Sequence, residues 1–180
     1  MKPSQPVRRI ITAQRDSADT SVFAVDEEVQ PAVHPVSGIT YWPIYGRDSI
    51  TRVPYQELEQ YGFTMFPSTP GGFRAHVIEF PAAGQADPLG RGDWPDRGLP
   101  PGWAADPDGD GMHWTNTVDV VVILDGEIGL AQGDGTEVTL RAGCVVVQNG
   151  AVHAWRRRDV PCRMVFVNLG AELRDPAPPS

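Results

Sequence analysis

The sequence has few cysteines, little positive charge and no long apolar run. Its 180 residues include 2 cysteines, and 15 Lys or Arg against 23 Asp or Glu give a formal net charge of −8. Cys144 and Cys162 each lie in or beside a β-type run, where we expect buried free thiols. The acidic balance argues against nucleic acid or an anionic membrane surface as a partner.

Several sequence signatures are also absent. No segment approaches the ~20 apolar residues of a membrane span, and no apolar signal core follows the N-terminus, so we expect a cytoplasmic protein. There is no internal repeat and no Gly-rich phosphate loop between a strand and a helix. Nucleophilic acyl transfer has no support, because neither a nucleophile elbow nor a Cys-His signature occurs.

What the sequence does contain is turn residues between short apolar runs. The sequence contains 19 glycines and 18 prolines, which are high counts for one domain of this length. Runs of β-type residues occupy 118–124, 127–131, 136–141, 144–148, 151–157 and 162–169, with Gly, Asn and Asp between them. Short strands with regular turns predict a sandwich or a closed barrel.

The chain divides into an arm, a barrel and a tail. Residues 1–70 are predicted to form an N-terminal arm with strands near 10–13, 21–25 and 39–42 and a short helix at 54–61. The barrel is expected at 71–172, beginning with a strand at 72–80, and residues 173–180 as a disordered tail. The long segment 81–112, dense in Pro, Gly and Asp, is typical of a functional or disordered loop.

Three polar residues stand at the edges of the apolar runs: His113, Asp119 and His153. Side chains alternate faces along a strand, so positions 113, 115, 117 and 119 point the same way if this segment is extended. A buried carboxylate needs a partner, and a metal or a hydrogen-bonded histidine pair would provide one. Alternatively, Asp119 lies near the strand end and bonds to backbone or Arg groups, with His113 in a loop.

The spacing of these residues resembles the first motif of the cupin superfamily. That motif reads His-x-His, three or four residues, Glu, six residues, Gly, and the matching positions here are His113, Thr115, Asp119 and Gly126. Asp119 thus stands at the glutamate position and Thr115 at that of the second histidine.

The second cupin motif is similar to the segment from residue 143 to residue 153. It reads Gly, about five residues, Pro-x-Gly-x-x-His, and the matching positions are Gly143, Gln148, Gly150 and His153, with Gln148 where the motif has proline. The resemblance covers roughly residues 71–170.

The resemblance implies an all-β fold, a double-stranded β-helix or jelly-roll cupin barrel carrying the N-terminal arm. It also implies one divalent metal ion, Fe, Mn, Ni or Zn, held by His113, Asp119 and His153. Three side chains would leave coordination positions open for water, substrate or dioxygen. Alternatively, Thr115 marks a cupin that has lost its metal and binds a ligand in a pocket.

Further site residues are predicted from strand faces. On the strand 72–80, Arg74 and His76 share one face and Glu79 lies on the other. His76, Tyr41 and Glu79 are candidates for acid–base catalysis, and Arg74 for substrate binding. For His76, a satisfied structural histidine is the simpler interpretation.

The strand that contains His153 gives two more candidates, because Trp155 and Arg157 share its face. Trp155 would form an apolar pocket wall, and Arg157 would pair with a substrate carboxylate, although exposure at the surface is an open alternative for Arg157. Thr115 is the remaining candidate for substrate binding.

Together these observations predict a metal-dependent cupin that acts on a small carboxylate- or carbonyl-bearing molecule. A lyase reaction such as dehydration or decarboxylation is favoured, with a non-haem Fe(II) oxygenase or a metal-free binding protein as alternatives. We also expect a homodimer, since Ile10, Ile11, Val22, Phe23 and Val25 are apolar residues of the arm that need a surface to cover them.

Overall fold

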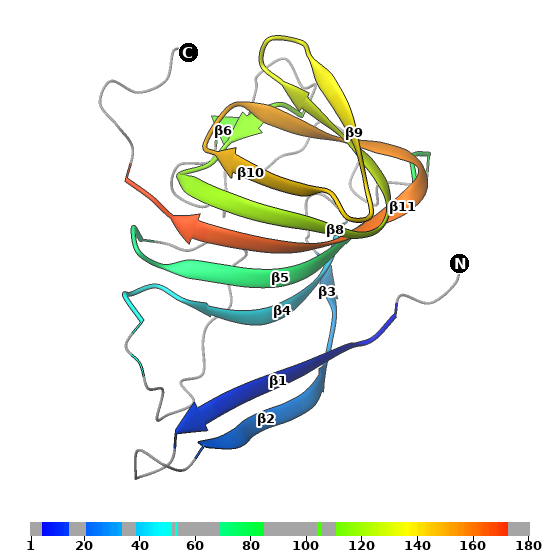
Figure 1. Ribbon diagram of the computed structural model, residues 1–180. Coiled ribbons are helices and arrows are strands. Elements are labelled where there is room, and N and C mark those ends of the chain that lie inside the picture. The colour runs from blue at the N-terminus through cyan, green and yellow to red at the C-terminus, as the bar shows by residue number, and fades with distance from the viewer. Residues whose placement is uncertain are drawn as a thin grey trace.

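The computed structural model describes residues 5–14, 21–33, 39–51, 53, 69–84, 104–105 and 111–172. Every regular element within these ranges is a strand (Figure 1). The strands are β1 (Val7–Gln14), β2 (Ser21–Val29), β3 (Ala32–Val33), β4 (Thr40–Arg47), β5 (Phe73–Phe80), β6 (Ala104–Ala105), β7 (His113–Trp114), β8 (Thr117–Gln132), β9 (Glu137–Arg141), β10 (Val145–Asn149) and β11 (His153–Gly170). The helix expected at 54–61 and the tail at 173–180 lie outside the described ranges. Within them, no helix has the length and apolar character that crossing a membrane requires.

β8 and β11 are long because each joins two runs that the sequence predicts as separate strands. Their mutual register shifts between Arg157 and Cys162, and Gly126 lies opposite Cys162 with a φ of 73°. A Cβ at position 126 would come within 1.8 Å of the carbonyl oxygen of Pro161. Glycine therefore permits the close backbone approach at which both strands bend.

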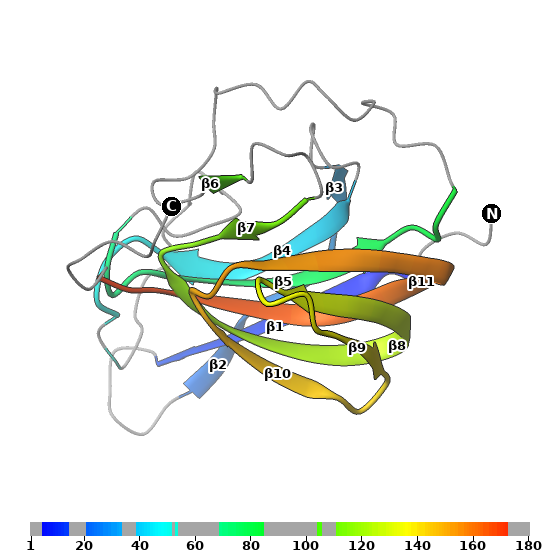
Figure 2. The ribbon, with the colours of Figure 1, turned by 90° about the horizontal axis from the view of Figure 1, so that it is seen from above.

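The bend carries β8 and β11 from one layer of the sheet into the other. In the first layer, β10, the first half of β8, the second half of β11, β5 and β4 lie side by side (Figure 1). In the second layer, β7, the first half of β11, the second half of β8 and β9 are neighbours, and Figure 2 shows β7 beside the orange part of β11. Antiparallel layers joined by strands that pass through both form a jelly roll, so the predicted all-β jelly-roll fold is confirmed.

The two layers enclose an apolar core. Buried residues alternate along the first half of β8 at positions 117, 119, 121 and 123, as expected for a strand with one inward face. The core consists of Ile78, Phe80, Val121, Ile123, Ile128, Leu130, Leu140, Cys162, Met164 and Phe166. Both cysteines are free thiols, as expected, but only Cys162 is buried in this core, and Cys144 is half-buried and packs against it.

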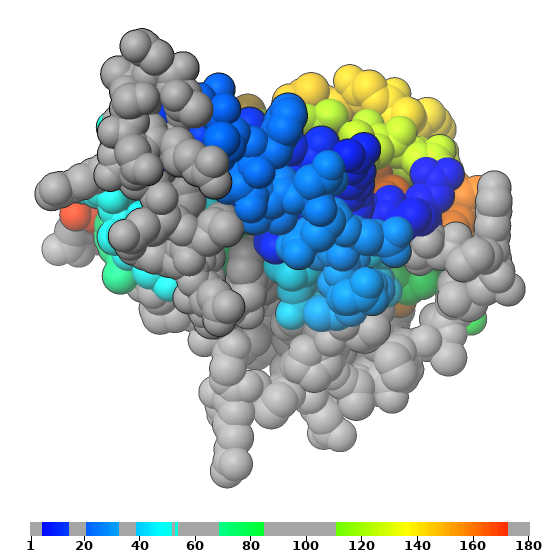
Figure 3. Space-filling view, turned by 90° about the horizontal axis from the view of Figure 1, so that it is seen from below, coloured from blue at the N-terminus to red at the C-terminus, as the bar shows by residue number. Residues whose placement is uncertain are grey.

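The N-terminal strands β1 and β2 pair as an antiparallel hairpin that packs against the outer face of the first layer. Figure 3 shows the hairpin, in blue, lying across this side of the molecule. Val29 of β2 packs with Trp42 of β4 and Val77 of β5, and Arg9 donates a hydrogen bond of 3.1 Å to the carbonyl of Ile44. The arm therefore covers apolar surface of its own barrel.

The first layer begins earlier in the chain than the sequence analysis expected. β4 pairs with β5 from Thr40, opposite Glu79, to Arg47, opposite Phe73. The boundary predicted between residues 70 and 71 consequently falls inside one sheet.

Candidate functional site

A row of polar side chains crosses the first layer at one end of the barrel. Arg74, Asn168, Asp119 and Gln148 lie opposite one another on β5, β11, β8 and β10. Their exposed fractions are 2%, 1%, 2% and 5%. Polar groups buried this deeply need hydrogen-bond partners, so the row marks either a structural network or a binding site.

The carboxylate of Asp119 is held by its neighbours. Asn168 Nδ2 donates a hydrogen bond of 2.8 Å to Asp119 Oδ1, and Thr117 makes a further hydrogen bond to the carboxylate. The hydroxyl groups of Thr115 and Thr117 lie 2.7 Å apart. Burial raises the pKa of Asp119, whereas the hydrogen bonds from Thr117 and Asn168 partly offset that rise. Residues 115, 117 and 119 thus share one face, as strand geometry predicts.

His113 and His153 face each other at the same end of the barrel. They are opposite one another on β7 and β11, and their ring centroids are 4.5 Å apart. His113 Nδ1 lies 3.0 Å from the carbonyl oxygen of Gly111, and His153 Nδ1 lies 2.8 Å from that of Ala151. Because a carbonyl oxygen only accepts, each Nδ1 carries the proton and each Nε2 carries the lone pair.

Both imidazoles favour the neutral form. Burial lowers the pKa of His113 to about 4, with a smaller lowering from the nearby His153 and an opposing effect of the Gly111 carbonyl. Burial also lowers the pKa of His153, against the raising effect of the Ala151 carbonyl. Neutral imidazoles are the form in which histidine binds metals.

The histidine pair has the chemistry of a metal site. A ligating histidine usually donates its other ring N–H to a carbonyl or a carboxylate, and both rings do so here. Within the described part of the chain, however, no three His, Cys, Asp or Glu side chains come together as a group able to hold a metal. The structure therefore places two of the three predicted ligands, His113 and His153, face to face. The carboxylate of Asp119 accepts hydrogen bonds from Asn168 and Thr117.

Tyr41 and His76 occupy the interior of the first layer. His76 is fully buried, with an exposed fraction of 0%, and the ring centroids of Tyr41 and His76 are 5.9 Å apart in an edge-to-face contact. His76 does not form a group of three ligands with His113 and His153 within the described residues. A catalytic role for either residue stays a prediction.

Glu79 lies on the opposite face of β5 and pairs with Arg163 of the neighbouring strand β11. Its Oε2 is 3.8 Å from Nη1 of Arg163, whose guanidinium lies 4.8 Å from the ring centroid of Trp42 under the hairpin. Glu79 thus lies on the strand face opposite His76, as the sequence predicts, and an acid–base role for it stays a prediction.

The two arginines predicted to bind substrate, Arg74 and Arg157, lie on different strands, β5 and β11. Arg74 is at the polar end, and its Nη2 lies 2.7 Å from Oδ1 of Asp48 in an ion pair that joins the buried guanidinium to an exposed carboxylate. Arg157 lies opposite the core residue Ile128 in the register of β11 and β8. It is four residues along β11 from His153, a separation of about 13 Å between the two backbone positions. A contact between Arg157 and substrate stays a prediction.

Trp155 lies beneath the histidine pair. Its ring centroid is 5.9 Å from that of His153, 5.9 Å from that of Phe166 and 6.2 Å from that of Phe80. The indole thus joins the polar end to the apolar core, on the strand face that the sequence predicts, while a contact with substrate stays a prediction.

Asn168 and Thr117 are site residues that the sequence reasoning missed. Asn168 is the lone polar residue between the apolar neighbours Val167 and Leu169, and it shares the inward face of Met164 and Phe166. An amide inside such a strand was the available signal, because it must bond to a buried partner.

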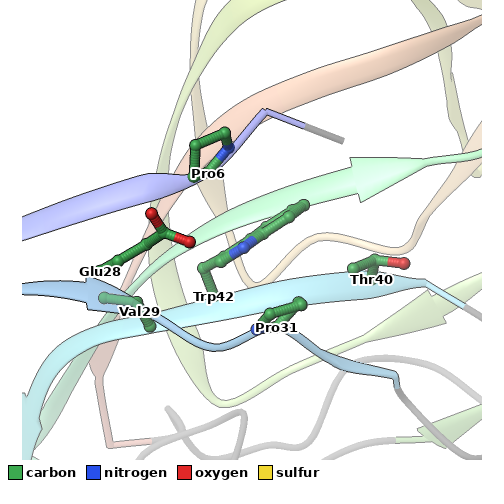
Figure 4. A pocket seen from close by; sticks show the side chains of 6 residues that line it. All are labelled: Pro6, Glu28, Val29, Pro31, Thr40 and Trp42. Carbon is green, nitrogen blue, oxygen red and sulfur yellow. The ribbon is translucent and has the colours of Figure 1, made fainter. Parts of the chain in front are cut away.

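A separate hollow of about 420 Å³ lies between the hairpin and β4 (Figure 4). It is lined by Pro6, Glu28, Val29, Pro31, Thr40 and Trp42. None of these residues belongs to the polar row or the histidine pair, so the hollow is distinct from the candidate site.

Comparison with known proteins gives a match to part of the chain. No family model matches the sequence. Over 63 residues the chain is 46% identical to two proteins of Diaporthe leptostromiformis, "Phomopsin biosynthesis cluster protein C'" and "Phomopsin biosynthesis cluster protein D". The match covers 34% of this chain and 33% of each relative, so the chain spans about a third of the length of these curated relatives.

Solved structures of low sequence identity resemble the chain more broadly. An ethanolamine utilization protein Q from Salmonella typhimurium is 10% identical, with 93% of this chain and 98% of that chain covered and a TM-score of 0.47. The DMSP lyase DddQ from Ruegeria pomeroyi is 16% identical, with coverages of 79% and 56% and a TM-score of 0.43. An RmlC-like cupin from Shewanella frigidimarina is 12% identical, with coverages of 78% and 82% and a TM-score of 0.41.

Because these TM-scores are all below 0.5, the jelly-roll fold is assigned from the strand order of this chain and not from the solved structures. Both sequence motifs lie where a jelly roll brings them together: the first spans β7 and β8, and the second spans β10 and the start of β11. The positions of both motifs and the strand order agree with the jelly-roll barrel that the resemblance to cupins implies.

Proposed function

We propose that this protein is a cupin enzyme of the lyase type, a dehydratase or decarboxylase acting on a small carboxylate- or carbonyl-bearing molecule. The observation that carries the proposal is the facing pair of neutral histidines, each with its Nδ1–H held by a backbone carbonyl. The two curated relatives are named for a phomopsin biosynthesis cluster, which supports a role in a biosynthetic reaction.

In this proposal His113 and His153 hold one divalent metal through their Nε2 atoms. The bound metal would act as a Lewis acid that polarises a substrate oxygen. The fixed Nδ1–H groups keep both rings in the tautomer and the orientation that ligation requires.

Asp119 takes the acid–base role in place of the ligand role that the motif implies. Its carboxylate is oriented by Asn168 and Thr117, and burial raises its pKa above that of an exposed aspartate. A carboxylate with a raised pKa is a stronger base, so it is suited to removing a proton from substrate and returning it to a leaving group. The hydroxyl group of Thr115, which is hydrogen-bonded to that of Thr117, would bind a substrate oxygen beside the carboxylate.

The remaining interior residues shape the pocket in this proposal. Trp155 provides an apolar wall beneath the histidines, and Tyr41 and His76 are further proton-transfer candidates within the barrel. An apolar wall beside converging polar groups is the usual composition of a small-molecule site.

Metal analysis tests the metal site directly. Protein purified without chelator or affinity metal is expected to contain about one Zn, Ni or Mn per chain, and His113→Ala or His153→Ala to remove most of it with the fold retained. Asp119→Asn is expected to keep the metal and to lose the activity, because it removes the base and not a ligand. His76→Gln is the matched control, a buried histidine outside the pair that should leave metal content unchanged.

Other results would contradict specific parts of the proposal. Stoichiometric iron with oxygen uptake would indicate the oxygenase, and no metal would indicate a binding protein. Loss of metal in Asp119→Asn would restore that residue to the ligand set. Full metal retention in both histidine variants would refute the histidine site.

A further inference from the structure

The carbonyl oxygen of Ala151 accepts hydrogen bonds from two buried side chains. His153 Nδ1 lies 2.8 Å from it, and Gln148 Nε2 donates to it over 3.0 Å. The exposed fractions of Gln148 and His153 are 5% and 1%. The last inward-facing residue of β10 and the first residue of β11 are therefore joined through one peptide group.

The turn between these residues has little packing of its own. Asn149, Ala151 and Val152 are exposed, and Gly150 has a φ of 63° with the Thr115 carbonyl 3.0 Å from where its Cβ would lie. A tight, exposed turn can rotate its peptide planes at small cost unless hydrogen bonds fix them. The Gln148 amide, held inside the barrel, fixes the Ala151 peptide.

We propose that Gln148 is a positioning residue for His153. Holding the Ala151 carbonyl in place keeps its oxygen directed at His153 Nδ1, so the proton stays on Nδ1 and the lone pair stays on Nε2. The cupin motif resembled by this segment has proline at position 148, where a rigid ring restricts the backbone before the turn. In this chain a side-chain hydrogen bond provides that restraint.

Control of the His153 tautomer by Gln148 depends on the two hydrogen bonds to the Ala151 carbonyl alone. Control of metal affinity rests in addition on the proposed function. Carbonyl and carboxylate groups that orient ligating histidines affect metal affinity by about 10–100-fold, and the same range is expected for the residue that orients such a carbonyl.

The test compares Gln148→Met with wild type and with Asn149→Ala, a control in the same turn whose side chain is exposed. Methionine retains the length and the apolar stem of glutamine and lacks the donor. Long-range ¹H–¹⁵N spectra are expected to show the Nδ1–H tautomer of His153 in wild type and in Asn149→Ala, and a mixture of tautomers in Gln148→Met. Titration with Zn²⁺ is expected to show a roughly 10–100-fold weaker affinity in Gln148→Met.

An unchanged His153 tautomer in Gln148→Met would overturn the inference, whatever the zinc titration shows. If wild type binds no Zn²⁺, the proposed function fails and the tautomer spectra still decide the role of Gln148. Should Gln148→Met not fold, wild type alone provides the test: the side-chain amide protons of Gln148 are expected to exchange slowly with solvent, and rapid exchange would refute the hydrogen bond to Ala151.

Discussion

At the scale of single residues, burial of the histidine pair sets a pH dependence of stability. The pKa of His113 is lowered from its ordinary value of 6.5 to about 4, so between these pH values the unfolded chain binds a proton that the folded chain does not. The free energy of unfolding therefore falls as pH falls through this window, by at most about 1.4 kcal/mol per pH unit for one group. Below about pH 4 this contribution levels off, because both states are then protonated.

Denaturant unfolding of metal-free wild type and His113→Gln from pH 7 to pH 4 checks this prediction. Glutamine retains hydrogen-bonding capacity without the titration, so the variant is expected to lose less stability than wild type across the window. The raised pKa of Asp119 acts in the opposite sense, since stability from that group is lost as pH rises above its ordinary 3.8. The difference between the two proteins isolates the histidine, and parallel pH profiles would contradict the lowered pKa.

The sequence predicted the histidine pair but not the surroundings of the carboxylate. His113 and His153 follow from motif spacing, because a jelly roll brings the start of β7 beside the start of β11. Asn168 lies 49 residues from Asp119 along the chain, and only the register of β8 and β11 places the amide against the carboxylate. The strand pattern gave the face of Glu79, which lies beside Arg163, but the roles predicted for Glu79 and Arg157 stay predictions.

At the scale of elements, the turn residues Gly126 and Pro161 mark bends within strands. The sequence predicts separate runs on either side of each residue, because Gly and Pro are turn residues in short-range patterns. In the structure the backbone continues through them, with Gly126 against the carbonyl of Pro161. Bends of this kind depend on contacts between strands far apart in the sequence, which local patterns do not contain.

Two alanine variants separate this steric requirement from backbone strain. Gly126 and Gly135 have similar φ values of 73° and 83°, but a Cβ at 135 would meet no atom within 4 Å. Gly135→Ala is expected to lower the free energy of unfolding by roughly 1–2 kcal/mol, the cost of a left-handed residue. Gly126→Ala is expected to cost more than about 4 kcal/mol, because the strand bend must open to admit the methyl group.

Chemical denaturation of both variants measures the difference. Equal losses would mean that the contact between Gly126 and Pro161 relaxes easily and that φ alone matters. A loss at position 126 that exceeds the loss at 135 would locate the constraint in the crossing of β8 from one layer to the other.

At the scale of the whole molecule, the hairpin has one covered face and one exposed face. Val29 packs inward on Trp42, whereas Ile10 and Phe23 point outward with exposed fractions of 50% and 77%. Both strands of the hairpin also have an unpaired edge within the described residues, because β1 and β2 pair with each other alone. The predicted dimer was motivated by apolar residues of the arm that need a covering surface. The chain's own barrel covers those on the inward face of the hairpin, and those on the outward face stay exposed.

We propose that this outward face contacts a second copy of the chain in a homodimer. The net charge of −8 opposes self-association, but Arg8 and Asp26 on this face neutralise each other over 2.6 Å. Sedimentation velocity is expected to show a dimer for wild type. Phe23→Asp is expected to weaken it at least about tenfold, since apolar aromatic anchors dominate interface energies and a two-fold contact would bring two new carboxylates together.

Val138→Asp is the matched control, because Val138 is 55% exposed on β9 and has no part in the hairpin. This variant is expected to dimerise like wild type. A monomeric wild type would refute the dimer. Equal weakening by both variants would show that added negative charge, and not the hairpin face, controls association, since one more charge on any part of an acidic surface increases repulsion between copies.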